Sequence, residues 1–143
     1  MNLDDGIERF ILAQEDVYPL ALQEIRKGRK TSHWMWFVFP QIRGLGFTDY
    51  NVYFGLKNLA EAKEYIEHPV LGKRLVEISE AVLSQKGKTA LEIFGVPDQR
   101  KLKSCMTLFS RLPNADPVFQ TVLEKYYEGL SDEKTIAILE AQN

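Results

Sequence analysis

The sequence predicts an all-α protein, a compact bundle of about seven to nine short helices. Three observations support this prediction. Glycine and proline fall between segments rather than within them, apolar residues inside the segments recur at three- and four-residue spacing, and most segments open with a helix-capping residue. With 143 residues, 45% hydrophobic and 27% charged, the chain is expected to form a single helical domain over residues 1–143.

Two helices are predicted at the start of the chain. The first has apolar residues at Ile7, Phe10 and Ile11, which share one helix face. The second ends at Gly28, a residue type that often follows the last turn of a helix. Its apolar stripe consists of Val17, Ala21, Leu22 and Ile25.

The middle of the chain has the clearest helix signals. Asn58 followed by Glu61 has the spacing of a capping box, and so has Thr89 followed by Glu92, which opens a short helix that stops at Gly95. Between them, the longest helix is predicted from Pro69 to about Lys86, with His68 at the junction before it. Its apolar residues are Leu71, Leu75, Ile78 and Val82.

Three further helices are predicted toward the C-terminus. Pro97 opens the first, Asp116 and Pro117 open the second, and Ser131 opens the last. Cys105, the only cysteine, lies in the apolar stripe of the first and is therefore expected to be a buried, inert thiol. That stripe comprises Leu102, Cys105, Met106, Phe109 and Leu112.

The segment from His33 to Phe39 is too short and too uniformly apolar for periodicity to separate a strand from a helix. A helix is favoured because the surrounding segments are helical and an isolated strand would lack a partner. Thr31 or Ser32 is predicted to cap this helix, and Pro40 to end it.

Charge and composition exclude several classes of function. A net charge of −2 argues against a protein that coats nucleic acid, although a local basic patch still suits a small anionic ligand. The acidic stretch Met1 to Asp5 has no apolar run behind it, and no stretch approaches a membrane span, so a cytoplasmic protein is expected. With two distant histidines and one cysteine, no metal site or cofactor is predicted.

The aromatic segment and its flanks are the candidate ligand-binding region. Basic residues precede it, both tryptophans lie in it, and a polar glycine-containing loop follows it. In the functional hypothesis, Lys30 and Arg43 hold an anionic group, and His33 acts as acid or base. Hydrogen bonds come from Ser32, His33 and Gln41, and Trp34 or Trp36 stacks on a flat ring, as a nucleotide-like ligand would require.

Other interpretations of these residues remain open. The aromatic run can instead form the centre of the core, with the basic residues at a solvated helix end. Asp98 and Lys101, on one helix side with Ser104, are further candidate catalytic residues, or else a surface ion pair. Gly44-Leu45-Gly46 is expected to be a turn, since it lacks the rest of a phosphate-binding fingerprint.

The string from Gly28 to Gln41, followed by Gly44-Leu45-Gly46, resembles the bacterial family catalogued as domain of unknown function 1810. Further matching stretches follow in the same order, from Phe10 to Phe119, so the resemblance covers essentially the whole chain. They include Ala13-Gln14, Tyr18, His68-Pro69, Ile93-Phe94-Gly95, Asp98, Lys101-Leu102 and Met106-Thr107-Leu108-Phe109.

The resemblance implies a mainly helical structure and says little about activity. Members often carry the label calpastatin, which names a disordered inhibitor of animal cells and does not suit this globular composition. A faint similarity around Lys101 to Phe109 links the chain to N-glycosidases that release ADP-ribose from modified bases. The functional hypothesis, which rests on the aromatic segment and its flanks, is a domain that binds a small anionic nucleotide-like ligand. Whether it also hydrolyses this ligand or cleaves its N-glycosidic bond is left open. The alternative is a non-enzymatic protein-interaction module or homo-oligomer.

Overall fold

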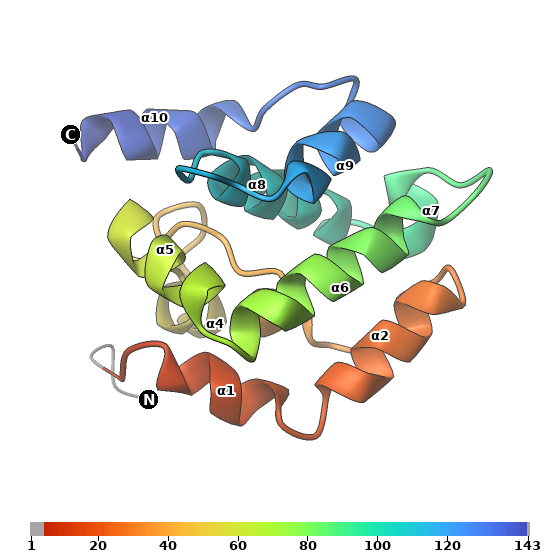
Figure 1. Cartoon of the computed structure of the whole chain (residues 1–143), viewed down its shortest axis with the longest axis horizontal. Coiled ribbons are helices and arrows are strands. Elements are labelled where there is room, and N and C mark those ends of the chain that lie inside the picture. Colours follow the sequence, from red (N-terminus) through yellow and green to blue (C-terminus); the bar gives the residue numbers. More distant parts are fainter. Residues whose placement is uncertain (1–4, 143) are drawn as a thin grey trace.

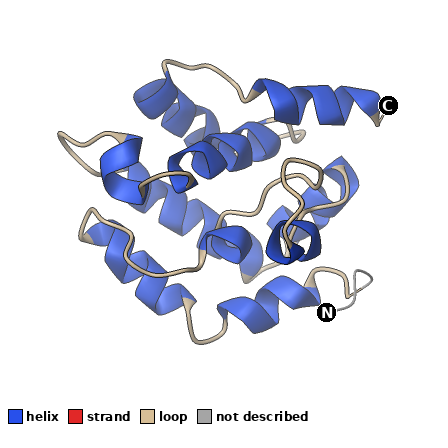
Figure 2. Cartoon of the chain, turned by 180° about the vertical axis from the view of Figure 1, so that it is seen from behind, coloured by secondary structure: helices blue, strands red, loops and turns tan. Residues whose placement is uncertain are grey.

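The computed structural model describes residues 5–142, and these residues form ten α-helices and no β-strand (Figures 1 and 2). The predicted all-α fold is confirmed. The acidic stretch that supported a cytoplasmic address lies mostly outside the described residues, in Met1 to Asp4. The helices are α1 (Glu8–Gln14), α2 (Tyr18–Arg26), α3 (Met35–Val38), α4 (Asp49–Tyr53), α5 (Leu59–Glu67), α6 (Leu71–Leu83), α7 (Ala90–Phe94), α8 (Asp98–Ser110), α9 (Pro117–Tyr127) and α10 (Glu133–Ala141).

Helices α6 and α8 organise the core. Helix α6 packs against α2, α5 and α9, and α8 packs against α5, α7, α9 and α10. A chain of buried aromatic rings links α1 to α9 through α5 and α8, with successive ring centres 5.0, 5.6 and 5.7 Å apart. These rings belong to Phe10, Tyr65, Phe109 and Phe119, and their contacts hold elements that are distant in sequence together.

Local capping signals placed several helix starts correctly. Thr89 and Glu92 form the full capping box, and Asp116 caps α9 through a hydrogen bond from the Val118 N–H. At α5, Asn58 accepts a hydrogen bond from the Glu61 N–H, but the Glu61 carboxylate accepts from the Lys57 N–H because it also pairs with Arg9. No helix among the described residues is long and apolar enough to cross a membrane.

Two predicted caps were wrong. The last helix is capped by Asp132, one residue after Ser131. Helix α3 covers only Met35–Val38 and has no side-chain cap, because the Ser32 hydroxyl donates to Glu24 instead. The predicted helical state of this aromatic segment is confirmed, as is the buried position of Cys105.

Helix α4 was not predicted. It lies in the segment from Gln41 to Leu56, hereafter the 41–56 loop, which follows Pro40 and is closed by two backbone hydrogen bonds. The Arg43 N–H donates to the Leu56 carbonyl (2.8 Å), and the Leu56 N–H donates to the Gln41 carbonyl (2.9 Å). No residue of α4 is buried, so apolar periodicity gave no signal for it.

Candidate functional site

Glu24 fixes the path of the chain that leads to the aromatic segment. Its buried carboxylate accepts hydrogen bonds from the Thr31 N–H (2.8 Å), the Ser32 N–H (3.0 Å), the Ser32 hydroxyl (2.6 Å) and the Trp34 indole N–H (3.0 Å). Burial by itself raises the pKa of Glu24, but the hydrogen bonds from Ser32, Thr31 and Trp34 outweigh burial and lower the pKa to about 2. The carboxylate is therefore a fixed anion around which residues 30–34 are wrapped.

Lys30, Asp98 and Lys101 form an ion-pair network at the start of α8. One Asp98 oxygen lies 2.8 Å from Lys30 Nζ, and the other lies 3.4 Å from Lys101 Nζ. Lys30 also donates to the Ser32 carbonyl, and its ammonium lies 5.0 Å from the centre of the Trp34 ring. The side chain of Lys30 is only 7% exposed, so its ammonium pairs with Asp98 rather than with a ligand. This ion pair joins residues 30–34 to α8.

A cleft of about 640 Å³, hereafter the α8 cleft, opens beside this network. One wall is the first half of α8, another is the connection from α9 into α10, and the third is the 41–56 loop. Four cationic side chains and two acidic ones line it, which leaves a surplus of positive charge in a chain of net charge −2. The cations are Arg100, Lys101, Lys103 and Lys134, and the acids are Asp132 and Glu133.

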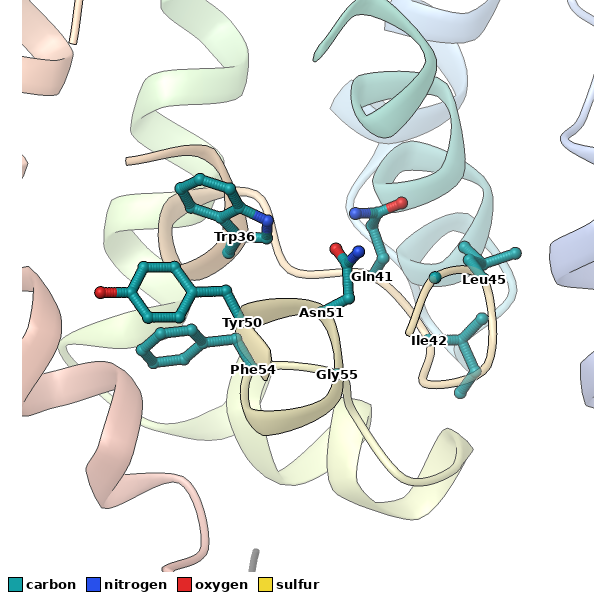
Figure 3. Close-up of a pocket in the computed structure, with 9 residues that line it drawn as sticks. Trp36, Gln41, Ile42, Leu45, Tyr50, Asn51, Phe54 and Gly55 are labelled. Carbon is teal, nitrogen blue, oxygen red and sulfur yellow. The ribbon is translucent and has the colours of Figure 1, made fainter. Parts of the chain in front are cut away.

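A second, narrow pocket adjoins the α8 cleft and shares Gln41 and Asn51 with it. Figure 3 shows its aromatic side, where Trp36 and Tyr50 meet edge to face with ring centres 5.0 Å apart. The amides of Gln41 and Asn51 lie in the same pocket and supply both hydrogen-bond donors and acceptors (Figure 3). Its free volume is only about 10 Å³, so the pocket is nearly filled by its own side chains.

The structure brings together some of the sequence-predicted site residues. Lys101 and Gln41 line the α8 cleft, and Trp36 lines the narrow pocket. Asp98 lies behind Lys101, bound to it and to Lys30.

The other predicted residues lie away from the cleft lining. His33 is exposed on the connection before α3, and Ser32 is bound to Glu24. Trp34 is fully buried, so of the two tryptophans only Trp36 is near a surface that a ligand can reach. The Arg43 guanidinium donates to the Val52 carbonyl (3.0 Å) inside the 41–56 loop, and one of its nitrogens is buried without a hydrogen-bond partner.

Sequence reasoning missed Arg100, Lys103 and Lys134 as site residues. A signal was present for the first two, since three cations fall within four positions at the start of α8. Cations are disfavoured in the first turn of a helix, so the presence of Arg100 there needs a reason other than helix stability. Lys134 gave no such signal, because only the fold brings α10 to the cleft.

Among residues 5–142, no group of histidine, cysteine and acidic side chains could hold a metal ion. Cys105 is completely buried, and burial raises the pKa of its thiol well above the usual range. The chemistry that the site offers is therefore electrostatic binding by cations, hydrogen bonding by amides and contact with aromatic rings.

Comparisons with known proteins agree with the fold. A comparison with curated proteins finds no match. Among solved structures, the chain matches the crystal structure of the conserved hypothetical protein Rv1873 from Mycobacterium tuberculosis, with 47% sequence identity and a TM-score of 0.92 over 94% of this chain and 96% of that one. The family model described as "Protein of unknown function (DUF1810)" matches residues 4–139. The chain therefore belongs to the DUF1810 family, as its tryptophan-containing string indicated.

Proposed function

We propose that the protein binds a small phosphorylated, nucleotide-like ligand in the α8 cleft, with the anionic group on the cations of α8 and α10. The proposal rests on one observation. Three cations from two helices line the same cleft: Arg100 and Lys103 from α8, and Lys134 from α10. Within the described residues, none of these three side chains forms an ion pair, so their charges are available to a ligand. A phosphate in the cleft would be attracted by these charges.

Size and polarity also support a nucleotide-like ligand. A volume of about 640 Å³ lies within the range of roughly 300–1,000 Å³ that small-molecule sites occupy. Gln41 and Asn51 stand where the cleft meets the aromatic pair, a position suited to the edge of a base or the hydroxyls of a sugar. Lys101 and Asp98 remain the candidate catalytic residues for hydrolysis of that ligand, in a protein that we expect to be cytoplasmic.

The test is a thermal-shift series with nucleotides, NAD, ADP-ribose, sugar phosphates and pyrophosphate. Binding at about 100 times the dissociation constant adds about 2.7 kcal/mol and should raise the melting temperature by roughly 5–10 °C in a domain of this size. The same mixtures, separated by chromatography after incubation, reveal any hydrolysis product.

A double variant, Arg100→Ala with Lys134→Ala, is expected to lose the shift while melting at the wild-type temperature without ligand, because both side chains are exposed. The matched control is Lys86→Ala with Arg111→Ala, which removes two other exposed cations that do not line the cleft. Retained binding in the first variant, or equal loss in both, would refute the α8 cleft as the site.

A further inference from the structure

We infer that Lys101 makes the site selective for aromatic ligands that carry phosphate, because its ammonium covers the Trp36 ring until an anion draws it into the α8 cleft. This inference rests on the proposed function and assigns Lys101 a role that a simple phosphate contact would not have. The residue would couple two parts of the site, the cationic cleft and the aromatic pair.

The positions of Lys101 and Trp36 support this coupling. Lys101 Nζ lies 4.6 Å from the centre of the Trp36 ring, within the range of a cation–π contact. Lys101 lines the α8 cleft and Trp36 lines the adjoining narrow pocket, while Gln41 and Asn51 line both. The lysine side chain therefore stands between the open cleft and the tryptophan.

A flat ring cannot stack on Trp36 while Lys101 stays in this position. Lys101 Nζ lies over the indole ring, and the narrow pocket gives no room for a ring, because its own side chains leave a free volume of only about 10 Å³. Tyr50 meets Trp36 edge to face, at an interplanar angle of 82°, and so occupies a second side of the indole. Movement of Lys101 would uncover the ring face nearest to the cleft.

Lys101 is the more distant of the two lysines that pair with Asp98. Its ion pair with Asp98 spans 3.4 Å, whereas Lys30 holds the other oxygen of Asp98 at 2.8 Å. If Lys101 leaves, Asp98 therefore keeps its closer cationic partner and is not left as an uncompensated charge. Arg100 and Lys103 flank Lys101 on α8, so the cleft around it repels cations and attracts an anion. Phosphate is thus the chemical group suited to pull Lys101 away from Trp36.

Adenosine, AMP and pyrophosphate separate the contributions of ring and anion in a calorimetric titration. With the wild type, AMP should bind at least about tenfold more tightly than adenosine, within the usual range of couplings between sites. In Lys101→Ala, adenosine should gain about fivefold or more in affinity, because the Trp36 face is open, while AMP loses affinity. Lys103→Ala is the matched control: it lines the same cleft but lies over Tyr127, so AMP should weaken and adenosine should not change.

Fluorescence of the wild type gives an independent measurement that does not depend on a lysine variant. Pyrophosphate should change the tryptophan emission as the ammonium leaves Trp36. Trp36→Phe should abolish the change, since the remaining Trp34 is fully buried and the ammonium over its ring, that of Lys30, keeps its own ion pair with Asp98. The inference is overturned if AMP binds the wild type but adenosine binds Lys101→Ala no more tightly than the wild type. It is also overturned if pyrophosphate binds without altering Trp36 emission. In both cases the proposed function survives. If neither AMP nor pyrophosphate binds the wild type, the proposed function fails and the inference fails with it.

Discussion

At the scale of single residues, Glu24 is the side chain on which the shape of the candidate site depends most directly. Its carboxylate satisfies two backbone N–H groups, one hydroxyl and the indole of Trp34. Replacement by glutamine keeps an oxygen for the N–H donors but removes the charge that strengthens each bond. We expect Glu24→Gln to lower the free energy of unfolding by about 1–3 kcal/mol at pH 7, as measured in urea.

The same variant should show a defined pH dependence. The folded-state pKa of Glu24 is lowered to about 2, so its ionised form stabilises the protein above its unfolded pKa of 4.5, and this contribution disappears as the pH falls toward 2. The difference in stability between the wild type and Glu24→Gln should therefore be constant above pH 6 and shrink between about pH 5 and pH 2. A difference that stays constant down to pH 3 would show that these hydrogen bonds do not lower the pKa of Glu24.

Trp34 and Trp36 mark the limit of sequence reasoning about single residues. They are two positions apart and chemically identical, and both were candidates for stacking on a ligand. Trp34 is buried, and its indole N–H donates a hydrogen bond to the carboxylate of Glu24, ten residues before it. No local pattern contains that information, because the hydrogen bond between Glu24 and Trp34 forms only when the connection between α2 and α3 is folded.

At the scale of elements, the 41–56 loop depends on a close approach at Gly55. A Cβ atom at this position would lie 2.8 Å from the Cα of Arg43 and 2.8 Å from the carbonyl oxygen of Asn51. Both are backbone atoms, so the loop would have to open. We expect Gly55→Ala to lower stability by about 1–3 kcal/mol and also to weaken AMP binding, because Asn51 lines the α8 cleft.

Gly72→Ala is the control that separates stability from binding. The added methyl would clash with the Ile66 carbonyl where α5 meets α6, away from the cleft. At a temperature where both variants are folded, Gly72→Ala should keep the wild-type affinity for AMP in a calorimetric titration, and Gly55→Ala should not. Equal affinities would mean that the 41–56 loop does not shape the site.

Helices were predictable where their signals are local, and α4 shows where those signals end. The capping box at Thr89 and the cap at Asp116 depend on residues within one turn, so the sequence is sufficient to locate them. Helix α4 has five residues, none of them buried, and its single side-chain cap is Thr48. The backbone hydrogen bonds that close the 41–56 loop hold this helix in place. These bonds join residues more than ten positions apart, so no local sequence pattern predicts them.

At the scale of the whole molecule, the candidate site joins segments far apart in the chain. Arg100 and Lys103 come from α8, Gln41 and Asn51 from the 41–56 loop, and Lys134 from α10. The aromatic segment, its basic neighbours, Asp98 and Lys101 could be predicted from the sequence. The cleft could not, because it depends on how α10 is placed against α8. The Ser104 hydroxyl donates to the Asp132 carboxylate (3.0 Å) and the Asp132 N–H donates to the Thr107 hydroxyl (2.9 Å), and these bonds anchor α10 there.

Cys105 offers a measure of the stability of the whole fold. Its thiol is fully buried in the core and burial raises its pKa, so a thiol reagent should react with it only when the protein unfolds. A ligand that binds only the folded state lowers the unfolded population by the factor 1 + [L]/Kd. At about 100 times the dissociation constant, AMP should therefore slow the labelling of Cys105 by about 100-fold, as followed by mass spectrometry. If AMP raises the melting temperature but leaves the labelling rate unchanged, the reagent reaches Cys105 through a local opening that leaves the α8 cleft intact, and the elements that cover Cys105 open more easily than the whole fold unfolds.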